Sequence, residues 1–216
     1  MERPECDPPP TETTSVSPST IFTNIPNTIT MARLLLTVLV FVLLEFAAAT
    51  DGVVVEASGS LVWVAFALFL VAAITDFLDG YLARRWNLVT AFGRIADPFA
   101  DKILIAGSLI VLLRFRAATD VLTHWYVVVV VAREFLVTAI RGVVEASGHP
   151  FPADRLGKWK MVSQCWTVAA LLALVGGAQT LRWAAVWGYW ISLVLTCVSG
   201  LNYVVKARAI VLRGAA

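Results

Sequence analysis

Four aspartates at short, regular intervals are the residues of this sequence best suited to chemistry. They fall where one apolar segment ends and the next begins, at Asp76, Asp79, Asp97 and Asp101. The first two are three residues apart and the last two are four apart, so each pair shares one face of a helix. A short turn between the pairs lets the two helices run antiparallel. All four carboxylates are therefore expected to converge on one volume.

A carboxylate that lies inside a membrane needs a positive charge beside it. If Arg84 marks the membrane boundary, Asp76 lies eight residues inward, which is about 12 Å along a helix at about 1.5 Å per residue. An ionised carboxylate inside a bilayer costs several kcal/mol unless it is paired or bound to metal. Hard oxygen ligands favour Mg²⁺, Mn²⁺ or Ca²⁺ over zinc. Four of them suit two ions about 4 Å apart, the arrangement used for in-line displacement at phosphorus.

Small residues and one arginine accompany the aspartates. Gly80 and Ala83 stand about one helical turn away and leave the backbone open to an approaching group. Gly93 precedes Asp97 at the start of the next helix. Arg84 stands where a phosphate held on the metals would receive a bidentate contact.

A boundary charge network is the alternative interpretation of the aspartates. In that case they would only pair with the neighbouring basic side chains, Arg84, Arg85, Arg94 and Lys102. Such a network explains any two of the aspartates. It does not explain the whole pattern, D-x2-D-G-x2-A-R-x8-G-x3-D-x3-D.

The composition indicates the setting in which these residues act. The chain has 216 residues, of which 59% are hydrophobic and 15% charged, and its mean hydropathy is +0.79. A membrane span needs about 20 apolar residues, and its backbone polar groups must be satisfied within it. We therefore predict an all-α integral membrane protein, with a net charge of +2 that suggests no nucleic-acid partner. Its six transmembrane helices are expected at about 31–49, 60–80, 97–114, 124–144, 161–179 and 183–205.

The ends of the chain differ from this apolar body. Residues 1–20 are rich in Pro, Ser and Thr and predict a disordered tail. A membrane domain over 21–208 follows, then a short C-terminal tail over 209–216. The domain opens with a short interfacial element that Pro26 interrupts. Basic residues concentrate in the second and fourth connections and at the C-terminal end, which places both termini and the aspartates on the cytoplasmic side of the cell membrane.

Two further polar stretches suggest a second binding region. Arg133 and Arg141 lie in the fourth segment, eight residues and about two turns apart, so they point the same way. Lys158 and Lys160 enter the fifth segment. Together the four cations predict a basic pocket for a phosphate-bearing substrate. The alternative is that Arg133 pairs with Glu134 or an aspartate, and that the lysines only follow the positive-inside rule.

The eight-position pattern resembles the signature of the CDP-alcohol phosphatidyltransferases, without a gap or substitution. The resemblance implies six membrane helices, two divalent ions (Mg²⁺ or Mn²⁺), a CDP-linked donor and a homodimer. Asp76, Asp79 and Asp97 would coordinate metal, and Asp101 would complete the site and act as the base. The residues that would meet the CDP moiety are Asp79, Gly80, Ala83, Arg84 and Gly93.

The basic stretches are similar to those of one branch of that family, the bacterial phosphatidylglycerophosphate synthases. The likeness rests on "ARE" with a second arginine eight residues on, on "GKxK" followed by a glutamine, and on an early N-x2-T-x2-R at Asn27, Thr30 and Arg33. Met161 departs from it, because that branch usually has threonine there. By this resemblance the phosphate of glycerol 3-phosphate would be held by Arg133, Arg141, Lys158 and Lys160.

The sequence therefore predicts transfer of a phosphatidyl group from CDP-diacylglycerol to sn-glycerol 3-phosphate, giving phosphatidylglycerol phosphate and CMP. The nearest alternative is the same chemistry with another acceptor, such as inositol phosphate, serine or phosphatidylglycerol. A cation transporter with the acidic cluster as its ion site is the alternative from a different class. Transporters often carry internal repeats, and none is visible here. A structural membrane protein would leave the aspartate spacing unexplained.

Overall fold

The computed structural model describes residues 25–48, 59–86, 91–146 and 155–214, and side chains for residues 30–48, 59–76, 99–100, 102–144 and 156–208. The tail predicted over 1–20 lies outside the described residues. Within them every regular element is helical. The elements are α2 (Ile25–Ala47), α3 (Gly59–Trp86), α4 (Ala91–Leu112), α5 (Arg116–Thr119), α6 (His124–Ala146), α7 (Arg155–Val175), η1 (Gln179–Leu181) and α8 (Arg182–Gly214).

The prediction of an all-helical chain is confirmed for the described residues, which include candidate membrane spans. Six long helices coincide with the six predicted segments, and among them three stretches are long and apolar enough to cross a bilayer, Thr30–Ala47, Gly59–Asp76 and Gln179–Arg208. In α4, α6 and α7 charged side chains interrupt the apolar sequence. Six membrane spans therefore stay a prediction.

The predicted interfacial element lies mostly before Ile25 and so outside the described residues. From Ile25 onward α2 is one helix that includes Pro26. Proline is tolerated in the first turn of a helix, where its missing N–H has no intrahelical partner to lose. At the other end α8 runs on to Gly214, so the backbone assigned to a C-terminal tail is helical as far as that residue.

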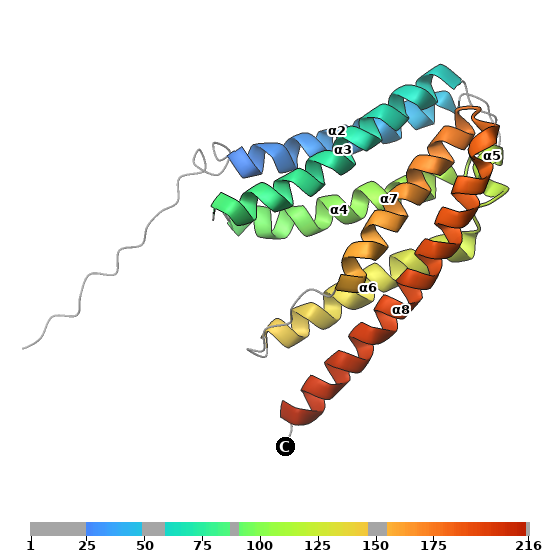
Figure 1. Cartoon of the computed structure of the whole chain (residues 1–216). Coiled ribbons are helices and arrows are strands. Elements are labelled where there is room, and N and C mark those ends of the chain that lie inside the picture. The colour runs from blue at the N-terminus through green and yellow to red at the C-terminus, as the bar shows by residue number, and fades with distance from the viewer. Residues whose placement is uncertain (1–24, 49–58, 87–90, 147–154, 215–216) are drawn as a thin grey trace, which may run out of the picture.

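The helices form two groups joined by α7 (Figure 1). Helices α2, α3 and α4 pack together, α6 packs against α8, and α7 packs against α3, α4 and α8. The apolar core lies between them and includes Val40, Leu44, Phe69, Leu109 and Leu171, all fully buried. Many large apolar side chains stay exposed on the outer faces, as expected of helices that meet lipid.

Paired polar side chains run along the interface of α6, α7 and α8. Tyr126 and Ser192 share a hydrogen bond of 2.6 Å between their hydroxyl oxygens. Further along, Gln164 Nε2 donates to Thr196 Oγ1 at 3.1 Å. A buried polar group is costly unless it has a partner, so these pairs fix the register of α8 against its neighbours. That register places the basic side chains described below.

Candidate functional site

The aspartate pattern is divided between two consecutive helices. Helix α3 carries Asp76, Asp79, Gly80, Ala83 and Arg84, and α4 carries Gly93, Asp97 and Asp101. Four residues separate Trp86 from Ala91, so the two helix ends lie within about 18 Å of each other. Figure 1 shows these ends side by side. Of the eight side chains, Asp76 belongs to the part whose side chains are described.

Asp76 forms an ion pair with Arg33 of α2. The arginine side chain is 2% exposed and the aspartate side chain 16%. A buried charge needs a counter-charge, and here each residue supplies the other's. Arg33 is the last position of the N-x2-T-x2-R stretch, whose Thr30 is also buried on α2. The structure thus joins the N-terminal stretch to the aspartate pattern through one contact, whereas the alternative interpretation from sequence considered only basic residues of α3 and α4 as partners.

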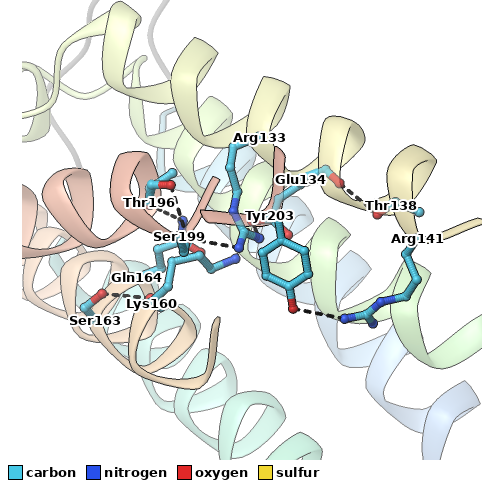
Figure 2. A network of polar contacts seen from close by, with 10 residues as sticks. All are labelled: Arg133, Glu134, Thr138, Arg141, Lys160, Ser163, Gln164, Thr196, Ser199 and Tyr203. Carbon is cyan, nitrogen blue, oxygen red and sulfur yellow. Dashed lines mark hydrogen bonds and ion pairs between the residues drawn. The ribbon is translucent and has the colours of Figure 1, made fainter. Parts of the chain in front are cut away.

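The predicted basic pocket is built on α6, with α8 packed against it (Figure 2). Arg133 is buried, and its Nη2 donates to Ser199 Oγ of α8 at 3.0 Å. Its Nη1 donates to Glu134 Oε1 at 3.1 Å, so the pairing considered as an alternative does occur. Gly200 permits the close approach of α8, because a Cβ at that position would lie 3.2 Å from Arg133 Cγ.

Tyr203 of α8 connects the two arginines. Its ring centroid lies 5.6 Å from Arg133 Cζ, and its hydroxyl accepts a hydrogen bond of 3.2 Å from Arg141 Nη2. Figure 2 shows the ring between the two guanidinium groups. The Nε atoms of both arginines are buried and have no hydrogen-bond partner among the described residues. The arginines therefore keep donors available for an anion.

Of the two predicted lysines, one is buried and one is exposed. Lys160 of α7 is 6% exposed and forms an ion pair with Glu134 of α6. Lys158 lies on the exposed part of the same helix. The structure thus brings Arg133 and Arg141 of α6 and Lys160 of α7 together, and these three residues form the basic network. Lys158 lies two residues from it along α7.

A small cavity adjoins this network between α4, α6 and α7. Its lining includes Lys102, Glu134, Lys160 and Gln164. Lys102 follows Asp101 directly on α4, so the cavity begins next to the aspartate pattern and ends at the basic network. A phosphate-bearing molecule in this region would meet cations on several sides.

Sequence reasoning missed the partners that α8 and α4 supply. Ser199 and Tyr203 stand four residues apart in an apolar helix, a spacing that puts both on one face. That pattern was a usable signal for a polar face toward α6. Lys102 was interpreted only as a boundary charge, and nothing in its local sequence indicates that it lines the same cavity as Lys160.

Comparison with known proteins agrees with the signature. The family model for CDP-alcohol phosphatidyltransferase matches residues 23–198, which include the aspartate pattern and the basic network. The match begins before α2 and ends within α8, so it takes in most of the helical body.

Three similar proteins carry the same curated name, CDP-diacylglycerol–glycerol-3-phosphate 3-phosphatidyltransferase. The one from Bacillus subtilis (strain 168) is 37% identical over 85% of this chain and 94% of its own length. The one from Rickettsia felis is 34% identical over 83% of this chain and 93% of its own. The one from Escherichia coli (strain K12) is 32% identical over 86% and 96%. With the family model spanning most of the helical body, this chain belongs to the CDP-alcohol phosphatidyltransferase family.

Proposed function

We propose that this chain transfers the phosphatidyl group of CDP-diacylglycerol to sn-glycerol 3-phosphate, giving phosphatidylglycerol phosphate and CMP. The observation that carries the proposal is the likeness to relatives of that name over more than four-fifths of the chain. The basic network supports the choice of acceptor, because a neutral acceptor has no phosphate to engage buried arginine and lysine side chains.

The acceptor phosphate is proposed to bind at the basic network. Arg133 and Arg141 are held by α8 with Nε donors to spare, and Lys160 stands across from them on α7. Planar guanidinium groups bind phosphate oxygens in pairs, and an ammonium adds a point charge. Lys158 completes the set from the exposed side of α7.

Two divalent ions, Mg²⁺ or Mn²⁺, are proposed to bind at the aspartate pattern. The donor set fits, because it consists of hard carboxylate oxygens on two helices whose ends adjoin. The residues that would hold the ions are Asp76, Asp79, Asp97 and Asp101. Bound there, the ions would neutralise charge on the diphosphate of the donor.

The side chains of α3 and α4 are proposed to bind the donor and to supply the base. The CDP moiety would be accommodated by Asp79, Gly80, Ala83, Arg84 and Gly93. Asp101 would take the proton from the acceptor's primary hydroxyl, whose oxygen then attacks the lipid-side phosphorus. The bond from that phosphorus to the CMP oxygen breaks, and CMP leaves. With the small residues near the diphosphate and Asp101 next to Lys102, the two substrates would lie on adjacent sides of one region.

We also infer a membrane arrangement that suits one lipid and one water-soluble substrate. The acyl chains of the donor stay in the bilayer while its head group meets α3 and α4 near their shared end. Both termini and the site would face the cytoplasm, because basic residues concentrate at that side. The family resemblance further suggests a homodimer.

Removal of divalent ions is expected to stop the reaction. The purified protein in EDTA should release no CMP from CDP-diacylglycerol and glycerol 3-phosphate, because the diphosphate charge is then opposed by four carboxylates. Excess Mg²⁺ or Mn²⁺ should restore CMP release, which is measured by chromatography. Undiminished turnover in EDTA after extensive dialysis would contradict the metal assignment.

An acceptor panel tests the proposed function directly. Purified protein receives CDP-diacylglycerol with glycerol 3-phosphate, inositol phosphate, serine or phosphatidylglycerol in separate reactions, and the lipid products are identified by mass spectrometry. Phosphatidylglycerol phosphate is the expected product. A different phosphatidyl lipid as the main product would replace the acceptor and leave the chemistry in place.

Loss of the Tyr203 hydroxyl is expected to weaken acceptor binding moderately. Tyr203→Phe removes the hydrogen bond to Arg141 but keeps the ring beside Arg133. Such a bond to a charged group is worth about 1.5–3 kcal/mol, and partial compensation by a bound phosphate should leave a rise of about five- to tenfold in the KM for glycerol 3-phosphate. The KM for the lipid donor should change little. An unchanged acceptor KM would show that the hydroxyl does not orient Arg141.

A further inference from the structure

Glu134 is the acidic residue at the basic network, and it contacts two of the cations. Its side chain is 15% exposed. Oε1 accepts from Arg133 Nη1 at 3.1 Å and also forms the ion pair with Lys160. Arg133 and Glu134 are neighbours on α6, whereas Lys160 comes from α7, so one carboxylate oxygen connects two helices.

The carboxylate of Glu134 matters because both cations that it contacts are buried. The side chains of Arg133 and Lys160 are 10% and 8% exposed. Two buried cations repel one another, and each is strongly unfavourable without a counter-charge. A long, flexible lysine side chain can also turn its ammonium group toward water and so leave such a site. Glu134 offsets the repulsion and keeps the ammonium group turned inward.

The cavity shows where that ammonium group is held. Glu134 and Lys160 line it together with Lys102 and Gln164. Lys102 and Lys160 line the cavity and Arg133 adjoins it through Glu134, so cations from three helices lie where a phosphate could bind.

We propose that Glu134 is a positioning residue for the acceptor, which holds Lys160 beside Arg133 where the acceptor's phosphate binds and does not itself touch the reacting atoms. The proposal rests on the proposed function, since it assumes a phosphate-bearing acceptor. It predicts that the effect of Glu134 on the acceptor is transmitted through Lys160.

The first experiment compares Michaelis constants for the two substrates. Glu134→Gln keeps the size of the side chain and removes its charge, so Lys160 loses its ion pair. The KM for glycerol 3-phosphate is expected to rise about tenfold, as for loss of one charge-assisted contact. The KM for CDP-diacylglycerol should stay near that of wild type. Glu45→Gln is the matched control, because Glu45 pairs with Arg114 at the other end of the bundle and should leave both constants unchanged.

The second experiment is a double-mutant cycle with Lys160→Met. The quantity is kcat/KM for glycerol 3-phosphate, which the slope at low acceptor concentration gives even without saturation. If Glu134 acts through Lys160, adding Glu134→Gln to Lys160→Met should lower it by less than about twofold further. If the losses in kcat/KM of the two single variants multiply in the double variant, Glu134 acts independently of the lysine, and the proposal is overturned.

Glu134→Asp keeps the proposal testable if the glutamine variant does not fold. It retains the charge and withdraws it by one methylene, so the acceptor KM should rise above that of wild type by less than about tenfold while the donor KM holds. An equal rise in both constants would overturn the proposal. Wild-type protein in the same assay separates failure of the Glu134 proposal from failure of the proposed function. If it makes no phosphatidylglycerol phosphate, the proposed function fails, and the cycle is then measured with the acceptor that the panel identifies.

Discussion

Asp101→Asn is expected to abolish CMP release from CDP-diacylglycerol and glycerol 3-phosphate. A positioned base contributes typically about 10²- to 10⁴-fold to a rate, and asparagine cannot accept the proton of the acceptor hydroxyl. Asp101 lies on α4, four residues after Asp97 and directly before Lys102, which lines the cavity next to the basic network. Asp101 is thus the member of the aspartate pattern next to a residue of the acceptor region, which suits the role of base proposed for it.

The measurement separates chemistry from binding. CMP release is followed by chromatography, and donor binding by the thermal stabilisation that CDP-diacylglycerol gives the detergent-solubilised protein. Binding should survive, because asparagine keeps an oxygen of similar position. Asp120→Asn is the matched control, since this exposed carboxylate pairs with Arg182 and lies outside the site. Wild-type turnover by Asp101→Asn would remove its assigned role.

Arg141→Ala is expected to raise the KM for glycerol 3-phosphate about 10- to 100-fold, the range for losing one or two charge-assisted hydrogen bonds. Arg141 uses Nη2 on the Tyr203 hydroxyl, and its Nε is buried without a partner among the described residues. A guanidinium has five N–H donors, so several stay available for a phosphate. Alanine removes all of them and also the positive charge.

The donor KM distinguishes an acceptor pocket from general damage. It should change little in Arg141→Ala, because the aspartate pattern lies on α3 and α4 and Arg141 on α6. Arg182→Ala is the matched control, since its side chain is 52% exposed and it pairs with Asp120 at 3.4 Å. If Arg141→Ala raised both Michaelis constants equally, the acceptor-pocket assignment would be wrong.

Hydropathy and spacing predicted the helices well because both are local properties. The six apolar segments coincide with the six long helices, and the proximity of Arg133 and Arg141 follows from two turns of one helix. Helix ends were less predictable. Helix α7 begins at Arg155 and not near residue 161, which places Lys158 and Lys160 on the helix itself. Polar residues at a membrane boundary lower the hydropathy without interrupting a helix.

Contacts between segments that are distant in sequence determined which side chains pair across the helices. Asp76 pairs with Arg33, 43 positions earlier in the chain, and no local pattern predicts that partner. Tyr203 lies 62 positions from Arg141, and Lys160 lies 26 positions from Glu134. Each of these contacts depends on which faces of two helices meet. That choice is made by packing over their whole length.

The sequence by itself determined the class of protein and its helices, because composition and periodicity are enough for each, and residue spacing along one helix led to the prediction of metal chemistry at the aspartates. Only the tertiary structure decided which partners hold the basic residues. It set Tyr203 between two arginines and Glu134 between Arg133 and Lys160. The physical reason is that a buried charge must find its counter-charge wherever the packed helices bring one within reach, however far apart the two lie in the chain.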